Sequence, residues 1–173
     1  MEKGLLMVFT GNGKGKTTAA LGMAMRTAGH NLKVCFIQFI KGGWHYGELD
    51  AVQRFAGLID LHVMGQGFTW KSENLEEDAR LAREGWKFAC DAIASGQYHL
   101  VVLDEFTYLL HYKMLEIEPC LEILTARNPR QHVVITGRYA PQQLLDVADL
   151  VTEMVPVKHP LQHGIKAQRG IEF

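Results

Sequence analysis

The stretch Gly11-Asn12-Gly13-Lys14-Gly15-Lys16-Thr17-Thr18 lies between an apolar run at residues 5–9 and a segment rich in alanine, methionine and leucine at residues 16–28. The run predicts a buried strand and the segment predicts a helix, so the glycines form a strand–turn–helix connection. Glycines let backbone N–H groups turn inward and approach phosphate oxygens, and the start of a helix adds partial positive charge. We therefore expect all eight residues to form a loop that binds the phosphates of a nucleotide.

The Gly-Lys-Thr that ends this stretch matches the P-loop of nucleotide-binding proteins, although Thr10 occupies the position of the usual first glycine. Lys16 is expected to supply a point charge to the phosphates, and the Thr17 hydroxyl to coordinate Mg²⁺. Lys14 lies inside the loop and is also placed to contact phosphate. A glycine-rich turn without a ligand is the alternative, and the two glycines upstream of Gly-Lys-Thr argue against it.

Apolar strands alternate with helical patterns along the rest of the chain. Strands are expected at residues 5–9, 33–39, 59–64, 100–103, 132–135 and 150–155. Helices are expected at residues 16–28, 48–56 and 74–93, around Pro119 and from Pro141, with an irregular segment at residues 156–173. Strands that are apolar on both faces are typical of a parallel sheet covered by helices on each side. We predict a single α/β domain over residues 1–173, a RecA-like P-loop NTPase fold with a mainly parallel sheet and helices on both faces.

The overall composition excludes several classes of protein. Eighteen Lys and Arg residues against nineteen Asp and Glu residues argue against a general nucleic-acid binder and against a membrane-surface protein. No apolar run approaches the roughly 18 residues of a membrane span, and the first residues do not fit a secretory signal. Cys35, Cys90 and Cys120 form no close pair, which disfavours disulfides and thiolate zinc sites. A cytoplasmic protein is expected.

Two carboxylates, Asp104 and Glu105, follow the apolar run at residues 100–103. Ligands of parallel α/β sheets bind beyond the carboxyl ends of the strands, which is where these side chains fall. Together with a P-loop, such a pair is expected to hold Mg²⁺ or Mn²⁺ directly or through water. Glu105 could instead act as a general base for ATP hydrolysis, and the sequence leaves both roles open.

The order and spacing of further blocks make the sequence similar to the ATP:corrinoid adenosyltransferases of the P-loop type, over nearly the entire chain. In addition to residues 11–18, the resemblance rests on Gln38-Phe39-Ile40-Lys41-Gly42, Met64-Gly65-Gln66-Gly67-Phe68-Thr69-Trp70, Val102-Leu103-Asp104-Glu105, Thr136-Gly137-Arg138, Ala148-Asp149-Leu150-Val151-Thr152-Glu153-Met154, Lys158-His159-Pro160 and residues 164–173.

This resemblance implies transfer of the 5′-deoxyadenosyl group of ATP to the Co(I) centre of cobalamin or cobyrinic acid a,c-diamide, with release of the whole triphosphate. It implies ATP as cosubstrate, Mg²⁺, and ATP bound in reverse along the loop, so that Lys16 stabilises charge on the departing triphosphate. It also implies that Phe68 and Trp70 lie under the corrin and displace the lower axial ligand of cobalt.

The resemblance further implies a homodimer and an external flavin-dependent reductase or flavodoxin as electron donor. Longer members of the family carry an N-terminal extension that this sequence does not contain, so no lid is expected from such a segment here.

Two histidine patterns are expected to have no metal role. Asp60-Leu61-His62-Val63-Met64-Gly65 matches the D-x-H-x-x-G pattern by which some corrinoid-binding proteins ligate cobalt. A His ligand would oppose four-coordinate cobalt, so we expect His62 to be a strand or loop-edge residue. His159 and His163 have the spacing of metal ligands, but the proline between them disfavours a helical zinc pair.

Other interpretations remain open from the sequence. A P-loop ATPase or small-molecule kinase would use Glu105 as its base, and a nucleotide-sensing module would bind ATP without turnover. Arg138 and Lys41 each follow a predicted strand, where they could reach phosphate. A packing or salt-bridge role for Arg138 and a solvated position for Lys41 are equally compatible with the pattern.

Overall fold

The structure, a computed structural model, describes residues 3–42, 45–65 and 75–172. Within these residues the chain forms a six-stranded sheet in the order β3-β2-β4-β5-β1-β6, and every neighbouring pair is parallel. The strands are β1 (Leu6–Thr10), β2 (Val34–Gln38), β3 (Ile59–Val63), β4 (Leu100–Asp104), β5 (His132–Thr136) and β6 (Leu150–Glu153). The predicted parallel α/β fold is confirmed.

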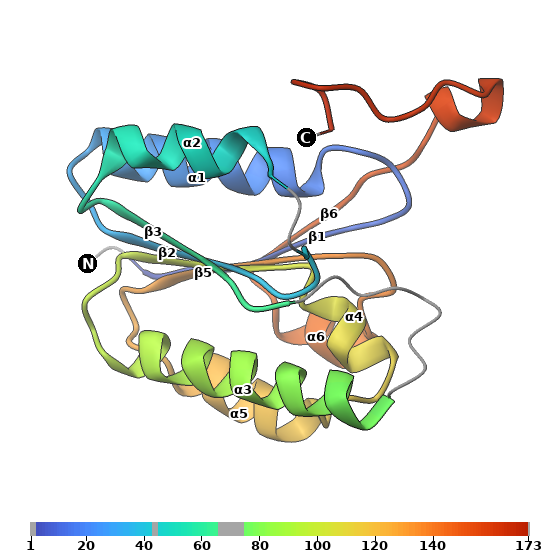
Figure 1. Cartoon of the computed structure of the whole chain (residues 1–173). Helices are drawn as coiled ribbons and strands as arrows, with labels where there is room; N and C mark the ends of the chain where they lie inside the picture. Colours follow the sequence, from blue (N-terminus) through green and yellow to red (C-terminus); the bar gives the residue numbers. More distant parts are fainter. Residues whose placement is uncertain (1–2, 43–44, 66–74, 173) are drawn as a thin grey trace.

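Helices cover both faces of this sheet, as predicted (Figure 1). One face carries α1 (Lys16–Gly29) and α2 (Gly47–Val52), the latter extended by a 3₁₀ turn at Gln53–Phe55. The other face carries α3 (Leu75–Ala94), α4 (Thr107–His111), α5 (Ile117–Ala126) and α6 (Gln142–Val147). A second 3₁₀ turn, Pro160–His163, lies in the otherwise irregular C-terminal segment.

The core is split into two layers by the sheet, because successive strand side chains point to opposite faces. Phe36 and Val102 pack with the alanines of α1. Ile37 and Leu103, their neighbours in sequence, pack on the other side with residues of α3 and α5. Every residue of β2 and β4 is buried, which explains why these strands are apolar on both faces.

The structure differs from the prediction at two places. The short helix α4 was not predicted, because its five residues are too few to give a clear helical pattern. The last strand ends at Glu153 instead of residue 155. Met154 leaves the strand because its carbonyl accepts a hydrogen bond from Gly13 in the glycine-rich loop, at 2.6 Å.

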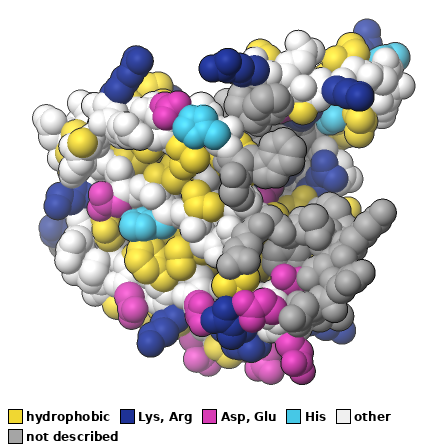
Figure 2. All heavy atoms as spheres, viewed as in Figure 1, with side chains coloured by type: hydrophobic (Ala, Val, Ile, Leu, Met, Phe, Trp, Pro, Cys, Tyr) yellow, Lys and Arg dark blue, Asp and Glu magenta, His cyan; other side chains and the backbone are white. Residues whose placement is uncertain are grey.

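Charged side chains of both signs are interspersed on the described part of the face seen in Figure 2. On α3, Arg80 pairs with Glu77 and Glu84, three and four residues away along the exposed surface of the helix. Among the described helices, none is both long and apolar enough to cross a membrane.

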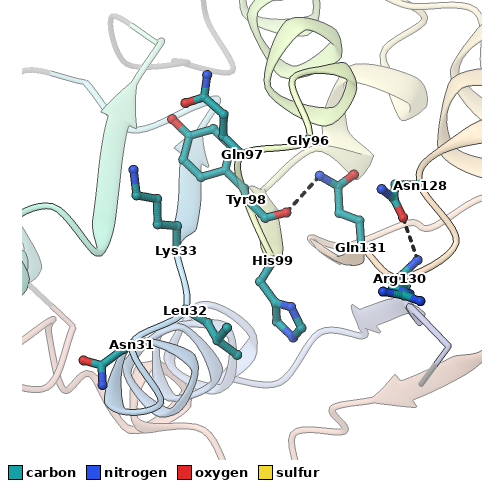
Figure 3. Close-up of a pocket in the computed structure, with 10 residues that line it drawn as sticks. All are labelled: Asn31, Leu32, Lys33, Gly96, Gln97, Tyr98, His99, Asn128, Arg130 and Gln131. Carbon is teal, nitrogen blue, oxygen red and sulfur yellow. Dashed lines mark hydrogen bonds between the residues drawn. The ribbon is translucent and has the colours of Figure 1, made fainter. Parts of the chain in front are cut away.

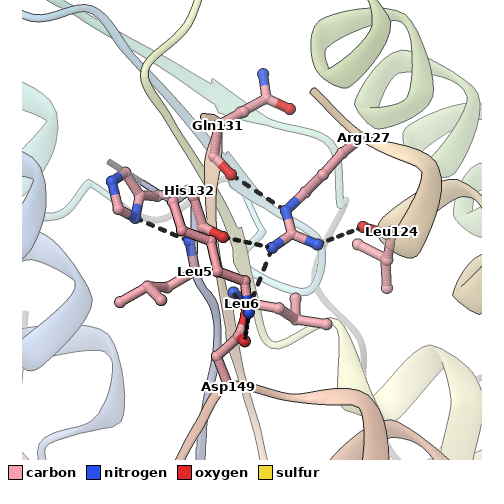
Figure 4. A network of polar contacts seen from close by, with 9 residues as sticks. Leu5, Leu6, Leu124, Arg127, Gln131, His132 and Asp149 are labelled. Atoms are coloured by element: carbon pink, nitrogen blue, oxygen red, sulfur yellow. Dashed lines mark hydrogen bonds and ion pairs between the residues drawn. The ribbon is translucent and has the colours of Figure 1, made fainter. Parts of the chain in front are cut away.

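Arg127 links the segments that lead into several strands at the amino-terminal edge of the sheet (Figure 4). Arg127 donates hydrogen bonds to the carbonyls of Leu124 (2.7 Å), Gln131 (3.1 Å) and Gly4 (3.1 Å). Its guanidinium also lies 3.7 Å from Asp149, whose other interactions include a hydrogen bond of 2.9 Å from the N–H of Leu6. The arginine therefore holds the start of β1 against the segments that lead into β5 and β6.

Replacing this arginine tests its structural role. Arg127→Ala should lower the free energy of unfolding by about 3 kcal/mol, because it leaves three buried carbonyls without their charged donor. Urea unfolding monitored by circular dichroism measures the change. The matched control is Arg80→Ala, which removes an exposed ion-paired arginine and should change stability by less than about 1 kcal/mol. Equal effects of the two substitutions would contradict the assignment.

Candidate active site

The glycine-rich loop connects β1 to α1 at the carboxyl edge of the sheet, as predicted. Gly11 and Gly15 adopt φ angles of 92° and 112°, in the region that favours glycine. A Cβ atom on Gly13 would lie 2.7 Å from the carbonyl oxygen of Met154. Close packing against the end of β6 thus requires glycine at position 13, in addition to any need to approach a phosphate.

Lys16 is held within this loop. Its Nζ donates hydrogen bonds to the carbonyl oxygens of Gly11, at 2.8 Å, and Gly13, at 2.7 Å. Burial lowers the pKa of Lys16, and the neighbouring positive charge of Arg138 lowers it further. The ammonium group is therefore positioned at the loop before any ligand arrives, in a place where a phosphate would further favour its charged form.

Asp104 is the buried acceptor around which the site is assembled. Its Oδ1 accepts hydrogen bonds from the hydroxyls of Thr17 (2.9 Å) and Thr136 (2.6 Å), and its Oδ2 accepts one from Nε2 of Gln38 (3.4 Å). Burial raises the pKa of Asp104, and the hydrogen bonds from Thr136 and Thr17 oppose that shift. The structure thus brings Thr17 and Asp104, two of the three predicted metal ligands, into direct contact.

Glu105 has an unusual backbone conformation beside this acid. Its φ angle is 63°, in the left-handed region that a glutamate rarely adopts, and such strained positions often mark functional sites. Its N–H donates a 2.8 Å hydrogen bond to the Thr136 hydroxyl, which fixes the turn after β4. Burial, and secondly the charge of Asp104, raises the pKa of Glu105 to about 7.

The donor set at this edge fits a divalent cation. Thr17 gives its only hydroxyl hydrogen to Asp104, so the lone pairs of its oxygen remain for a ligand. Asp104 and Glu105 add carboxylate oxygens, and oxygen donors are those that Mg²⁺ and Mn²⁺ prefer. A cation would also relieve the repulsion that raises the Glu105 pKa.

Lys41 and Arg138, whose roles the sequence left open, differ in their contacts. Lys41 forms an ion pair with Glu48, and its Nζ lies 4.5 Å from the centre of the Tyr46 ring. It is therefore not a solvated loop lysine. Arg138 is close enough to Lys16 and Glu105 to shift the pKa of each.

The remaining loop residues that were predicted to bind nucleotide are Asn12, Lys14 and Thr18, and all three have exposed side chains. Lys14 lies 3.1 Å from the carboxylate of Glu172 in the C-terminal segment. Their contacts with phosphate stay a prediction. Phe68 and Trp70 lie outside the described residues.

His62 occupies the strand position that was expected of it, and His159 caps a turn in the C-terminal segment. His62 belongs to β3, and its ring centre lies 4.6 Å from that of Phe88. His159 accepts a 3.2 Å hydrogen bond from the N–H of Leu161 and so caps the turn at Pro160–His163. In the described part of the chain, no group of three or more His, Cys, Asp or Glu side chains could hold a metal ion.

Sequence reasoning did not identify Thr136 and Gln38 as members of the site. Both are buried polar residues that end strands of otherwise apolar sequence, β5 and β2. The signal that could have found them is their position, since the carboxyl ends of parallel strands meet at one edge.

A cavity of about 260 Å³ lies at the opposite edge of the sheet (Figure 3). Its lining includes Lys33, His99 and Gln131, each immediately before or at the start of a strand. Because the glycine-rich loop and both carboxylates belong to the carboxyl edge, this cavity does not belong to the candidate site.

Comparisons with known proteins agree with this arrangement. The model of a family described as ATP:corrinoid adenosyltransferase BtuR/CobO/CobP matches residues 2–173. A corrinoid adenosyltransferase of Pseudomonas aeruginosa is 45% identical over 99% of this chain and 85% of its own length. A corrinoid adenosyltransferase of Escherichia coli (strain K12) is 44% identical over 99% of this chain and 87% of its own. A Salmonella typhimurium protein named corrinoid adenosyltransferase CobA has the same identity and coverage.

The raised pKa of Glu105 predicts a pH-dependent cost in stability. Between its ordinary value of 4.5 and about 7, the folded protein binds more protons at this group than the unfolded chain, so the contribution of Glu105 to stability falls as pH rises. Without divalent cations, Glu105→Gln should therefore stabilise the protein at pH 8 by about 2–3 kcal/mol and have little effect at pH 4.5.

Urea unfolding in EDTA at both pH values measures this difference. The control is Glu122→Gln, an exposed carboxylate on α5 that should give the same small effect at each pH. A stabilisation by Glu105→Gln that does not grow between pH 4.5 and pH 8 would disprove the assignment.

Proposed function

The chain belongs to the ATP:corrinoid adenosyltransferase family, and from this premise we propose that the loop at residues 11–18 and the carboxyl edge of β4 carry out its reaction. The enzyme is a transferase that moves the adenosyl group of ATP to a corrinoid. The observation that supports the proposed site is the hydrogen bond of 2.9 Å between Thr17 and Asp104, with Lys16 and Glu105 beside it. The corrinoid is cobalamin or cobyrinic acid a,c-diamide.

In the proposed reaction the Co(I) of the substrate donates its electron pair to the 5′ carbon of ATP, and this pair forms the carbon–cobalt bond. The carbon–oxygen bond to the α-phosphate breaks, and the electron pair of that broken bond leaves on the triphosphate oxygen. Negative charge grows on the departing oxygen. ATP is proposed to lie in reverse along the loop, as the family resemblance implies, with its ribose toward the corrinoid. The enzyme needs no nucleophile of its own, because cobalt supplies it.

Lys16 stabilises the departing triphosphate in this proposal. Its ammonium group is held on the carbonyls of Gly11 and Gly13, so little reorganisation is needed when charge develops. The backbone N–H groups of the loop and the start of α1 provide further positive potential. Arg138 adds a second cation near the same phosphates.

Thr17, Asp104 and Glu105 would hold Mg²⁺ or Mn²⁺ at this site. The cation would neutralise charge on the triphosphate and make it a better leaving group. Asp104 receives three hydrogen bonds from side chains of α1, β5 and β2, so its orientation is fixed in advance. Glu105 completes the oxygen set from the next position along the chain.

Phe68 and Trp70 are proposed to lie against the lower face of the corrin. The described chain before them, Met64 and Gly65, follows β3 at the carboxyl edge of the sheet. There the N–H of Met64 donates a hydrogen bond of 2.9 Å to the carbonyl of Gln38, the last residue of β2. A Cβ atom on Gly65 would lie 2.4 Å from the carbonyl oxygen of Phe39. The chain therefore enters the aromatic segment from the edge that carries the nucleotide loop.

The partners of the enzyme follow from the proposed chemistry. A Co(I) substrate requires a reductant, for which we propose an external flavin-dependent reductase or flavodoxin. A cytoplasmic homodimer is proposed by analogy with the family.

One observation favours a second activity, ATP hydrolysis or phosphoryl transfer with Glu105 as general base. The pKa of about 7 for Glu105 lies near the operating pH that suits such a base. The transferase family argues against a module that only senses nucleotide.

The products separate adenosyl transfer from hydrolysis. Under anaerobic conditions with ATP, Mg²⁺ and chemically reduced cobalamin, adenosyl transfer yields inorganic triphosphate and a photolabile carbon–cobalt bond visible in the absorption spectrum. Formation of ADP and phosphate without alkylated cobalt would overturn the proposal.

The loop lysine provides the first mutational test. Lys16→Ala should lower kcat at least about 100-fold, because an aimed charge-stabilising group is lost from the transition state. The carbon–cobalt product is followed by its absorbance. Lys33→Ala, at the opposite edge of the sheet, is the matched control and should retain normal turnover. Near-normal turnover of Lys16→Ala would remove this lysine from the mechanism.

The aromatic pair provides the second test. Phe68→Ala and Trp70→Ala should each leave ATP binding intact but reduce the four-coordinate Co(II) signal in electron paramagnetic resonance spectra, because the lower ligand or water can return to cobalt. Phe55→Ala, a half-buried aromatic of the 3₁₀ turn next to α2, should preserve the signal. Unchanged spectra in the first two variants would contradict the proposed role.

A further inference from the structure

Two buried glutamines in the described chain have a side-chain oxygen without a hydrogen-bond partner. Gln38 is fully buried and Gln131 is 3% exposed, and Oε1 is the unpartnered atom of each. Such an oxygen costs free energy, because it has lost water and gained no donor. Each therefore needs a physical explanation.

The two glutamines lie at opposite edges of the sheet. Gln131 precedes β5 and lines the cavity at the amino edge, where its Nε2 donates to the carbonyl of Tyr98 at 3.1 Å (Figure 3). Gln38 is the last residue of β2, at the carboxyl edge, directly beside Asp104 in the parallel register. Only the second lies next to the nucleotide loop.

The orientation of the Gln38 amide is fixed by its surroundings. Its Nε2 donates to Oδ2 of Asp104 at 3.4 Å, and its side chain lies close enough to Glu48 to help lower the pKa of that carboxylate. Rotating the amide by half a turn would place Oε1 against these carboxylates and repel it. Nε2 is therefore the atom turned toward Asp104, and Oε1 must face elsewhere.

The water molecules bound to a cation are donors of the kind that Oε1 of Gln38 lacks. Mg²⁺ gives up its water reluctantly and keeps several water molecules when it binds to proteins through one or two carboxylates. The hydrogens of those waters need acceptors, and residues that hydrogen-bond the ligands of a cation typically affect its affinity strongly.

We propose that Gln38 is a positioning residue of the cation site, with Nε2 orienting Asp104 and Oε1 accepting a hydrogen from the hydration shell of the bound cation. This inference rests on the proposed function, which places the cation on Thr17, Asp104 and Glu105. The role assigned to Gln38 acts through Asp104 and the cation.

Binding of Mn²⁺ to the full-length protein with ATP tests the proposal. Gln38→Met keeps the length of the side chain and removes both hydrogen-bonding groups. The electron paramagnetic resonance signal of free Mn²⁺ measures how much of the cation is bound. The affinity of the Gln38→Met protein for Mn²⁺ should be about 10-fold weaker than that of the unmodified protein, as is typical when such a partner is removed. ATP affinity measured in EDTA should stay unchanged. The KM for the cation should rise with kcat at saturating cation retained.

The matched control is Gln131→Met, which removes the other buried glutamine with an unpartnered oxygen. It should leave Mn²⁺ affinity unchanged, whatever it does to stability. If Gln38→Met does not fold, Gln38→Asn keeps a polar amide but is too short to reach Asp104, and it should show the same loss of affinity. Gln131→Asn is then its control.

Three results would overturn the inference. Mn²⁺ affinity within twofold of the unmodified protein would mean that Gln38 only supports the fold. An equal loss of ATP affinity in EDTA would mean that Gln38 acts on the nucleotide. An equal loss of Mn²⁺ affinity in the Gln131 variant would mean a general effect of a disturbed core. A failure of the proposed function would be seen in the unmodified protein instead. In that case ATP with the protein would bind no more Mn²⁺ than ATP alone.

Discussion

The hydrogen bond from the Thr17 hydroxyl to the buried carboxylate of Asp104 is the contact on which the site depends. It joins the first turn of α1 to the last residue of β4, which are 87 positions apart in sequence. Parallel strands bring these groups to one edge, and Thr136 from β5 and Gln38 from β2 complete the shell around the same carboxylate. Without that acceptor, α1 and the strands β2 and β5 would have no common partner.

The charges at this edge are arranged before any ligand binds. Lys16 is held by carbonyls of the loop, Lys41 by Glu48, and the Asp104 carboxylate by the hydroxyls of Thr17 and Thr136. Fixed dipoles and charges in a partly dry site act more strongly than in water and need little reorganisation during a reaction. Such an environment suits a reaction in which the substrate cobalt supplies the nucleophile and the protein stabilises the leaving triphosphate.

Family membership and local geometry contribute different parts of this account. The same loop supports hydrolases, kinases and transferases, so the fold alone does not define the reaction. The matches to corrinoid adenosyltransferases over nearly the full chain identify the chemistry. The geometry supports roles for individual residues, and it adds Thr136 and Gln38, which the motifs did not reveal.

The sequence by itself determined the parallel α/β class, the strand–loop–helix at residues 11–18 and the acids at the end of β4, because glycine content and apolar periodicity are local properties. The boundaries of most strands were predicted within two residues, whereas α4 was missed because five residues are too few to give a clear helical pattern. Only the tertiary structure decided that β4 lies between β2 and β5, and hence which side chains surround Asp104. It also decided the raised pKa of Glu105 and the unpartnered oxygen of Gln38. These properties arise from burial and from neighbours distant in sequence, and a local sequence pattern predicts neither of the two.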